Sequence, residues 1–344
     1  MLVPEVQVGN TDVVDPPLIE AMHTAKPTGD LALSAVVDEL PLTVVATPRV
    51  KPQTVRVIKG EKTLSVRYFF AGEERRNDLR FFLEQWAASY KDIKLEMSEI
   101  DILRGGQNHD LSDVELRRAH LEMPIIPDVT IATPPCNTHS RVLYANERGP
   151  RPGRNRAYPY GFPWLKSAMK EKIDQANGFV SFSIDLLRAA AAAGKLGLSE
   201  HPEDLGDVQG SCPASIWQLK EMRDLEELGY TSWAVHQSDF GAPYPKPTRF
   251  VDNANAAPHR HIHPGWPILD ANDKYLGPLP RPRKGLDLKR SAEDSSFRTG
   301  PTSAYPPDLC KLLAERIGRD YIVRNRIPPA PLEGDAEARL EEDV

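Results

Sequence analysis

The chain has 344 residues, a formal net charge of −6 and 27% charged residues. This length is enough for a full hydrophobic core. The negative balance excludes a uniformly basic protein that holds nucleic acid through its overall field, so any such contact must come from local lysine and arginine clusters.

The first half of the chain contains three predicted strands. Residues 1–60 are rich in proline and show no sustained hydrophobic period, which predicts an extended or partly disordered arm. A strand is predicted at 64–72, a helix around 79–86, where apolar residues recur at helical spacing, and a second strand at 92–101. The third strand, 129–133, is apolar and ends at two prolines, which cannot continue a strand interior.

The second half alternates helices and strands in the same way. A long helix is predicted from 165 to 193, because Gly194 follows it as a natural helix end. Downstream we expect a strand that ends at Glu200, then a helix, a strand and a closing helix at 213–228, 230–241 and 303–318. The alternation of strand and helix predicts an α/β fold with a doubly wound, mostly parallel sheet.

Composition divides the sequence into regions. We expect an arm at 1–60, a catalytic core at 61–252, a short irregular segment at 253–299, a closing helix of the core at 300–323 and a polar tail at 324–344. The three cysteines, Cys136, Cys212 and Cys310, are far apart and odd in number, which predicts a reducing compartment rather than a disulfide framework. No apolar run approaches the roughly 20 residues of a membrane span, and the start lacks signal-peptide features. We therefore expect an intracellular protein, nuclear in a eukaryote, that is a monomer without membrane contact.

Chemically capable residues stand at the ends of the predicted strands. Ligands bind in open α/β sheets at the carboxyl ends of the strands. Gly72 allows close approach to the backbone, Glu99 can accept hydrogen bonds from a ribose diol, and Asp110 can accept from an exocyclic amine. Cys136 and Glu200 follow later strands. Each residue alone has an ordinary explanation as a turn, a buried thiol or a solvated acid, whereas the ordered set favours a ligand site.

This ordered set resembles the cytosine-C5 methyltransferases, a family that uses S-adenosylmethionine on a Rossmann-like, class I methyltransferase fold. The resemblance extends from about residue 64 to 318 and depends on seven motifs in family order: YFFAG, SEID, HDLSD, PPCNTHS, EHP, SDFGAPYPKPTRF and TSAYPPDLCKLLAERI. The segment 253–299 stands in the place of a short target-recognition segment.

The resemblance implies a catalytic set. Cys136 is the implied nucleophile at cytosine C6, because C5 becomes reactive only after a thiolate has added to the ring. Glu200 is implied to share a proton with N3. Arg249 is implied as the cation near O2, with Arg141 as the alternative, and Ser140 matches the serine that follows the family's cysteine.

The resemblance also implies a cofactor site and a nucleic-acid contact. The residues implied to bind S-adenosylmethionine are Phe70, Ala71, Gly72, Glu99, Ile100, Asp110 and Pro134. The arginine-rich stretch after Cys136, with interleaved aromatic residues, suits phosphate contacts around a flipped base; an alternative is a solvated basic loop. The implied contacts are Arg148, Arg151, Arg154, Arg156 and Lys246.

Three alternatives remain at this point. The leading interpretation is methylation of cytosine in DNA, and the second is the same reaction on RNA. A catalytically silent module that binds nucleic acid or protein is the third; Tyr68, which stands where the family has an acid, favours it, while Cys136 and Glu200 oppose it. His259, His261 and His263 alternate as on one strand face, but no cysteine or carboxylate cluster accompanies them, so we expect a basic recognition patch and no metal.

Overall fold

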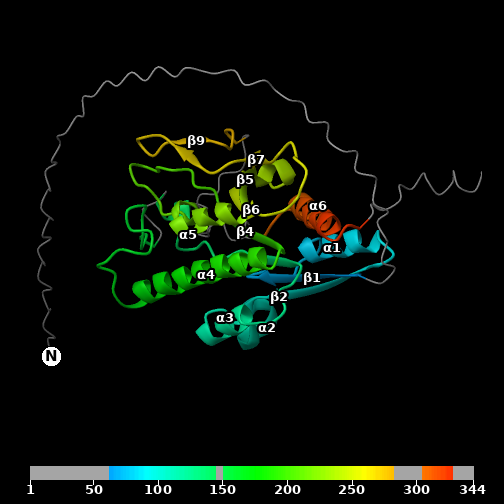
Figure 1. Cartoon of the computed structure of the whole chain (residues 1–344). Helices are drawn as coiled ribbons and strands as arrows, with labels where there is room; N and C mark the ends of the chain where they lie inside the picture. Colours follow the sequence, from blue (N-terminus) through cyan, green and yellow to red (C-terminus); the bar gives the residue numbers. More distant parts are fainter. Residues whose placement is uncertain (1–61, 145–149, 283–303, 328–344) are drawn as a thin grey trace, which may run out of the picture. The chain divides into compact units, whose positions relative to one another are not determined.

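The computed structural model describes residues 62–144, 150–282 and 304–327. Its main sheet has seven strands in the order β2-β1-β3-β4-β6-β5-β7 (Figure 1). The strands are β1 (Lys62–Phe69), β2 (Ile93–Ile100), β3 (Val129–Ala132), β4 (Leu196–Pro202), β5 (Thr231–His236), β6 (Pro247–Asp252) and β7 (His263–Pro264). A separate hairpin pairs β8 (Ile268–Leu269) with β9 (Tyr275–Gly277).

The first four strands of the sheet order form a parallel half. β1 pairs in parallel with both β2 and β3, and β3 pairs in parallel with β4. The chain therefore leaves β1 in opposite directions to reach β2 and β3, which makes the β1–β3 boundary the topological switch point of the sheet. The predicted α/β class and parallel core are confirmed, and this boundary is where such sheets leave room for a ligand.

The other half of the sheet is antiparallel, contrary to the simple alternation. β6 lies between β4 and β5 and runs antiparallel to both. The sequence did not indicate this strand, because Pro245 and Pro247 precede its apolar residues; Pro247 is tolerated since it is the first residue of the strand. The sheet is consequently mixed.

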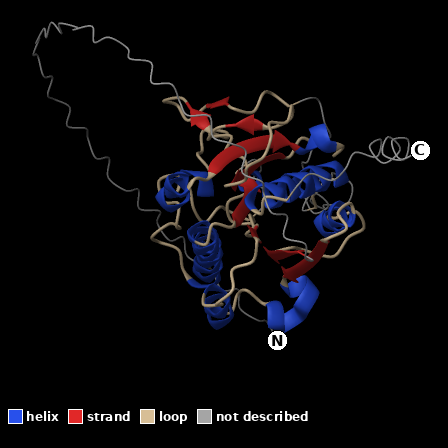
Figure 2. Ribbon diagram, turned by 45° about the vertical axis from the view of Figure 1, so that its right-hand side comes forward, coloured by secondary structure: helices blue, strands red, loops and turns tan. Residues whose placement is uncertain are grey.

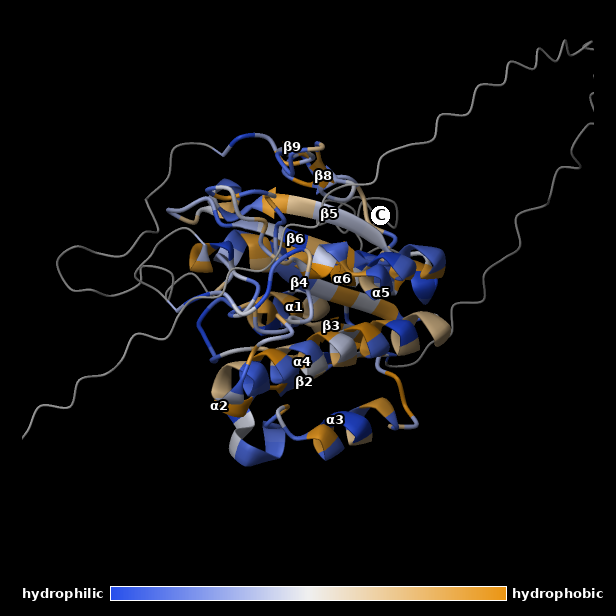
Figure 3. Ribbon diagram, turned by 90° about the vertical axis from the view of Figure 1, so that its left-hand side faces the viewer, coloured by the Kyte–Doolittle hydropathy of each residue, from blue (hydrophilic) through white to orange (hydrophobic). Residues whose placement is uncertain are grey.

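Helices cover both faces of the sheet (Figure 2). One core cluster joins alternate residues of β1, such as Leu64 and Val66, to α1 and α6, and the other face packs Phe69 and Ala132 against α4. Figure 3 shows the mixed apolar and polar surface of α4 that this one-sided burial requires. The α-helices are α1 (Leu79–Ala88), α2 (Ile102–Gly105), α3 (Val114–Leu121), α4 (Ser167–Ala192), α5 (Lys220–Arg223) and α6 (Pro307–Arg324).

Two helix predictions differ from the structure. α4 ends as expected just before Gly194, whose φ of +66° suits glycine at a helix end. The helix predicted over 213–228 is instead three short turns: Ile216–Gln218 and Asp224–Leu228 are 3-10 helices on either side of the four-residue α5. The reason is packing, since Ile216, Trp217, Leu219, Met222 and Leu225 are all buried, and a single straight helix would spread these five side chains around most of its circumference. The extended backbone of Leu219 interrupts the helix. Further 3-10 turns lie at Gly106–His109, Arg141–Leu143 and Gln237–Phe240.

A buried ion pair joins the antiparallel strands. The Arg249 side chain on β6 donates to both carboxylate oxygens of Glu203, from Nε at 2.6 Å and from a terminal nitrogen at 2.8 Å, and both side chains are 0% exposed. The other terminal nitrogen donates to Ser232 on β5 at 2.6 Å and to the Gly265 carbonyl. Tyr275 on β9 donates to Glu203 at 2.8 Å. One pair thus joins five segments: β6, β5, β9, the residue that follows β4 and the residue that follows β7.

The segment after β6 packs against the core through a second contact. Gly206, with φ +68°, lies so close to the 270–277 hairpin that a Cβ would approach the Asp273 carbonyl oxygen to 2.0 Å. Asp207 donates its backbone N–H to the same oxygen at 2.8 Å. The described part of the predicted 253–299 segment is therefore held by fixed backbone contacts; residues 283–299 lie outside the described residues, as do the arm at 1–60 and most of the tail. No helix in the described ranges is long and apolar enough to cross a membrane.

We expect Glu203→Ala to lower the free energy of unfolding by about 3–5 kcal/mol, because it leaves the Arg249 guanidinium buried without its anion. The measurement is chemical denaturation followed by circular dichroism. The double variant Glu203→Leu with Arg249→Met should recover most of this loss, since it removes both charges together. A loss below about 1 kcal/mol in Glu203→Ala would show that the pair is not needed to hold these strands.

Candidate functional site

The carboxyl ends of β1 and β3 are tied together at the switch point. The Thr133 N–H donates to the Phe69 carbonyl at 3.3 Å, and its hydroxyl donates to the Phe70 carbonyl at 3.1 Å. Phe70 has a φ of +61°, an unfavourable value for an aromatic residue that is held by its backbone bond to Ile100 and its ring contact with Phe179. Such strained backbone is typical of ligand sites.

Cys136 and Glu200 meet at this edge of the sheet. Cys136 follows β3, Glu200 lies near the end of the neighbouring β4, and both are half-buried. Burial raises the pKa of the Cys136 thiol, and the negative charge of Glu200 raises it further. Burial also raises the pKa of Glu200. Both groups therefore hold their protons more tightly than they would in water, and a proton can be exchanged between a nucleophile and an acid that lie at one edge.

Lys246 supplies the positive charge at the same place. Its ammonium group lowers the pKa of both Cys136 and Glu200, although burial outweighs it in each case. The residue lies between Pro245 and Pro247 with a φ of +32°. The predicted contact of Lys246 with nucleic acid stays a prediction; the structure places its charge close enough to act on both Cys136 and Glu200.

Arg249 points to the other face of the sheet. In the antiparallel pairing of β4 with β6, Glu200 lies opposite Phe250 and His201 opposite Arg249. Paired residues share a face and successive residues alternate, so Arg249 and Glu200 project to opposite sides. With its guanidinium committed to Glu203, Arg249 has a structural role in this arrangement.

Tyr305 is a functional neighbour that the sequence reasoning missed. Its hydroxyl donates to Glu200 Oε2 at 2.8 Å, and the residue is 8% exposed. Tyr305 precedes α6, and its own carbonyl accepts from Arg75. The hydrogen bond holds one carboxylate oxygen of Glu200 and so sets the direction of the other. The only available signal was its place in the closing motif, where the family has no tyrosine to suggest this contact.

The acid at the end of β2 is engaged with two arginines. Glu99 Oε2 accepts from Arg80 at 2.7 Å and from Arg104 at 2.8 Å, and the Glu99 side chain is 5% exposed. Arg104 also donates to the Gly72 carbonyl at 2.7 Å, while the Gly72 N–H donates to Asp101 at 2.9 Å. Glu99, the predicted ribose-binding acid, is thus already connected through Arg104 to the turn after β1.

The remaining cofactor residues lie around this turn. A Cβ built on Gly72 would meet no atom within 4 Å, so the space beside it is open. Asp110 accepts from Ser112, a contact that lowers its pKa and keeps it ionised. Ile100 and Pro134 are buried behind the edge, and Ala71 is half-buried. The predicted cofactor residues therefore lie at the ends of β1, β2 and β3, except Asp110, which stands farther along the chain after the Gly106–His109 turn.

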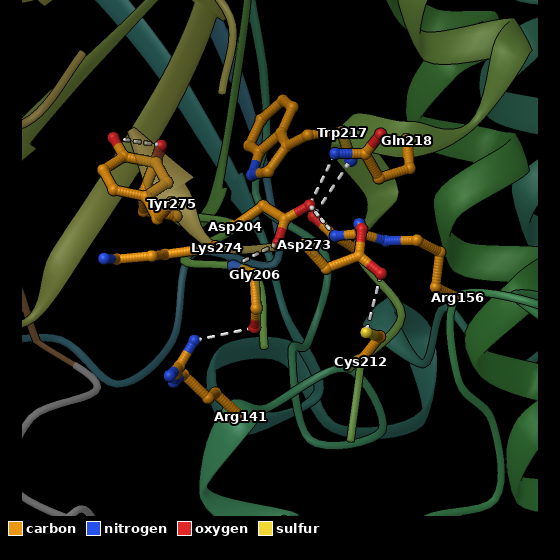
Figure 4. A network of polar contacts seen from close by, with 12 residues as sticks. Arg141, Arg156, Asp204, Gly206, Cys212, Trp217, Gln218, Asp273, Lys274 and Tyr275 are labelled. Atoms are coloured by element: carbon orange, nitrogen blue, oxygen red, sulfur yellow. Dashed lines mark hydrogen bonds and ion pairs between the residues drawn. The ribbon is translucent and has the colours of Figure 1, made fainter. Parts of the chain in front are cut away.

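The arginines of the 148–156 stretch have different environments. Arg154 is 1% exposed; it donates to His139 Nε2 at 2.8 Å, to the Pro159 carbonyl and to Asn177, and burial lowers its pKa to about 10. Arg156 pairs with Asp204 and Asp273 (Figure 4). Arg151 is exposed, and Arg148 lies outside the described residues. Of the predicted phosphate contacts, Arg151 is the one that the described surface presents to solvent.

Arg141 and Ser140 stabilise the turn after Cys136. Ser140 caps the 3-10 turn that begins at Arg141, accepting from Val142 at 3.4 Å. Arg141 donates to the carbonyls of Gly206 at 2.8 Å and Asp207 at 2.6 Å (Figure 4). Both residues therefore position the Cys136 loop rather than meet Glu200.

The face behind β4 carries a second buried polar group. His139 and His201 meet with ring centroids 5.2 Å apart. Burial lowers the pKa of His201 to about 3, so it is neutral, and its Nε2 is buried without a partner among the described residues. A small cavity of about 20 Å³ beside both rings has room for roughly one water molecule. In the described ranges, no group of three His, Cys, Asp or Glu side chains is arranged to hold a metal ion.

Comparison with known proteins adds no identification: no family model matches the chain, and searches of curated proteins and of solved structures give no match.

Alkylation of Cys136 by iodoacetamide will report the charges around it, because the thiolate is the reactive form. Glu200→Gln removes a negative charge, lowers the Cys136 pKa and speeds alkylation at neutral pH; Lys246→Met removes a positive charge and slows it. Peptide-resolved mass spectrometry against pH measures both shifts, and buried Cys310 serves as the internal control. Equal rates in wild type and both variants would show that the three side chains do not interact.

Proposed function

We propose that the protein is an S-adenosylmethionine-dependent methyltransferase that acts on C5 of cytosine in DNA. The observation that supports the proposal is the meeting of Cys136, Glu200 and Lys246 at the carboxyl edge of adjacent strands. This edge adjoins the switch point, where a Rossmann-like sheet binds its ligand. The proposal requires one cytosine, flipped from its stack, to lie between the thiol and the carboxyl group.

The residues supply a balanced addition to the ring. Cys136 Sγ forms a bond to C6, and the C5–C6 double bond gives up its electron pair as a proton is added at N3. Glu200, whose pKa is raised, donates that proton, and the proton of the Cys136 thiol replaces it. Lys246 stabilises negative charge at the edge during the exchange. Once C5 carries the methyl group, a water molecule would take the C5 proton, and its electron pair would form the C5–C6 double bond as the C6–Sγ bond breaks. The N3 proton would then return through Glu200 to Cys136 Sγ and restore the thiol.

The residues at the turn after β1 fit the implied cofactor. Open space beside Gly72, the strained Phe70 and the acids Glu99 and Asp110 offer a surface for a nucleoside with hydroxyl and amine donors. S-adenosylmethionine would supply an electrophilic methyl group there. Glu99 and Asp110 would orient it, and Ile100 and Pro134 would form the apolar wall.

A second candidate function has its own observation. Arg80 and Arg104 already bind Glu99, and Arg104 also fastens the Gly72 carbonyl. If these contacts persist when ligand is offered, the protein is a catalytically silent module that binds nucleic acid or protein. The same chemistry on RNA remains the neighbouring alternative, and the trapping experiment below includes it.

Isothermal titration calorimetry with S-adenosylmethionine tests the cofactor site. We expect binding to wild type and a Kd at least about tenfold weaker for Glu99→Gln, because charge-assisted hydrogen bonds to hydroxyl groups are lost. Glu96→Gln is the matched control, since Glu96 lies on the same strand and its exposed carboxylate pairs with Lys94. Absence of binding to wild type would favour the silent module.

Covalent trapping on 5-fluorocytosine tests the nucleophile. With S-adenosylmethionine present, fluorine at C5 blocks the final elimination, so an adduct stable to denaturing electrophoresis should accumulate. Cys136→Ala should abolish the adduct. Cys212→Ala should leave it intact, because the Cys212 thiol is hydrogen-bonded to Asp273. Matched DNA and RNA oligonucleotides identify the substrate. An adduct that survives Cys136→Ala would refute the assignment.

A further inference from the structure

Three aromatic side chains gather on the surface after the Cys136 loop. Phe162 and Trp164 stack with centroids 4.9 Å apart and rings inclined by only 6°, and Tyr158 meets both rings edge-on at 5.9 and 5.6 Å. Trp164 is 62% exposed and Tyr158 43%. With Phe162 against one face of its indole, Trp164 leaves much of its remaining surface to solvent. We refer to Tyr158, Phe162 and Trp164 as the aromatic platform.

The backbone that carries the platform is held by hydrogen bonds. Buried Arg154 donates to the Pro159 carbonyl at 2.8 Å and to Asn177 on α4 at 2.9 Å. Asn177 donates in turn to the Tyr160 carbonyl at 2.8 Å, and Phe162 donates its N–H to the Gly153 carbonyl at 3.0 Å. A surface fixed in this way loses little conformational entropy when a ligand stacks on it.

The stretch that carries the platform is locally basic, although the protein carries a net charge of −6. Residues 150–172 contain six basic side chains and one acid; of the six, Arg154 is buried, and Arg156 and Lys170 are paired with aspartates. Arg151, Lys166 and Lys172 of this stretch are exposed. Exposed aromatic rings among basic side chains are what single-stranded nucleic acids require, since bases stack on the rings and phosphates meet the charges.

We propose that the aromatic platform binds unpaired bases of a single-stranded nucleic-acid segment, with Trp164 as the principal stacking residue. The inference rests on the proposed function and deepens it, because it names the strand state of the nucleic-acid partner. It concerns binding alone and requires neither the thiol nor the cofactor. A proline-rich peptide is the rival occupant, since such peptides also dock on aromatic surfaces.

Fluorescence anisotropy with the full chain tests the platform. The probe is a labelled oligothymidylate of roughly a dozen nucleotides, within the range of known single-strand sites. We expect Trp164→Ala to weaken binding about fivefold or more, since one stacked base is lost, and Trp164→Phe to restore part of it. Phe81→Ala is the control for removing an exposed aromatic residue elsewhere, because Phe81 is 37% exposed on α1.

An abasic oligonucleotide of the same length separates stacking from charge. It should bind wild type more weakly than the oligothymidylate does, and Trp164→Ala should cause no further loss of its affinity. Arg151→Ala should weaken the binding of both oligonucleotides alike.

Equal affinity of wild type and Trp164→Ala for the oligothymidylate, or no binding at all, overturns the proposal that the platform binds bases. Trp164-dependent binding of a proline-rich peptide with no effect on the oligonucleotide also overturns it. If cofactor binding or covalent trapping fails while Trp164→Ala still weakens oligonucleotide binding, the methyltransferase proposal is refuted and the proposal for the aromatic platform is supported.

Discussion

The antiparallel half of the structure depends on one buried ion pair. Arg249 has all of its charge satisfied by Glu203, and the pair reaches β5 through Ser232 and β9 through Tyr275. Charges buried to this degree are costly unless they are fully paired and hydrogen-bonded. The geometry of β4, β5 and β6 must therefore keep these partners together. Because β4 also carries Glu200, the same constraint fixes the acid relative to the parallel strands.

The parallel half of the sheet determines where the side chains of the candidate site lie, rather than supplying a buried ion pair. β1, β3 and β4 end at a common edge, and two hydrogen bonds from Thr133 to the end of β1 hold two of these ends in register. Thiol, acid and ammonium groups from three distant parts of the sequence can meet there because the strands run side by side. Their mutual effects on pKa follow from that proximity: burial favours neutral Cys136 and Glu200, and Lys246 offsets part of it.

The sequence predicted the helices and strands better than it predicted which side chains contact one another. The parallel strands and α4 followed from apolar periodicity, prolines and Gly194, which are local signals. β6 did not, because Pro245 precedes it and Pro247 begins it, and neither did the separate short turns of 213–228, which tertiary packing imposes. The predictions for Cys136 and Glu200 rest on family order, and the structure places both at one edge. Arg249 could not be assigned in advance, since its direction depends on the pairing of His201 with it across β4 and β6. Lys246 and Tyr305 emerge only from the packed edge.

The contact between Gly206 and Asp273 has a consequence for how the protein can change. The 270–277 hairpin is attached by a backbone approach that leaves no room for a Cβ, together with the side-chain bonds of Asp273 to Arg156 and Cys212. The hairpin is therefore not a portable module. A hairpin grafted from another protein would keep these contacts only if the 203–207 turn, Arg156 and Cys212 were grafted with it.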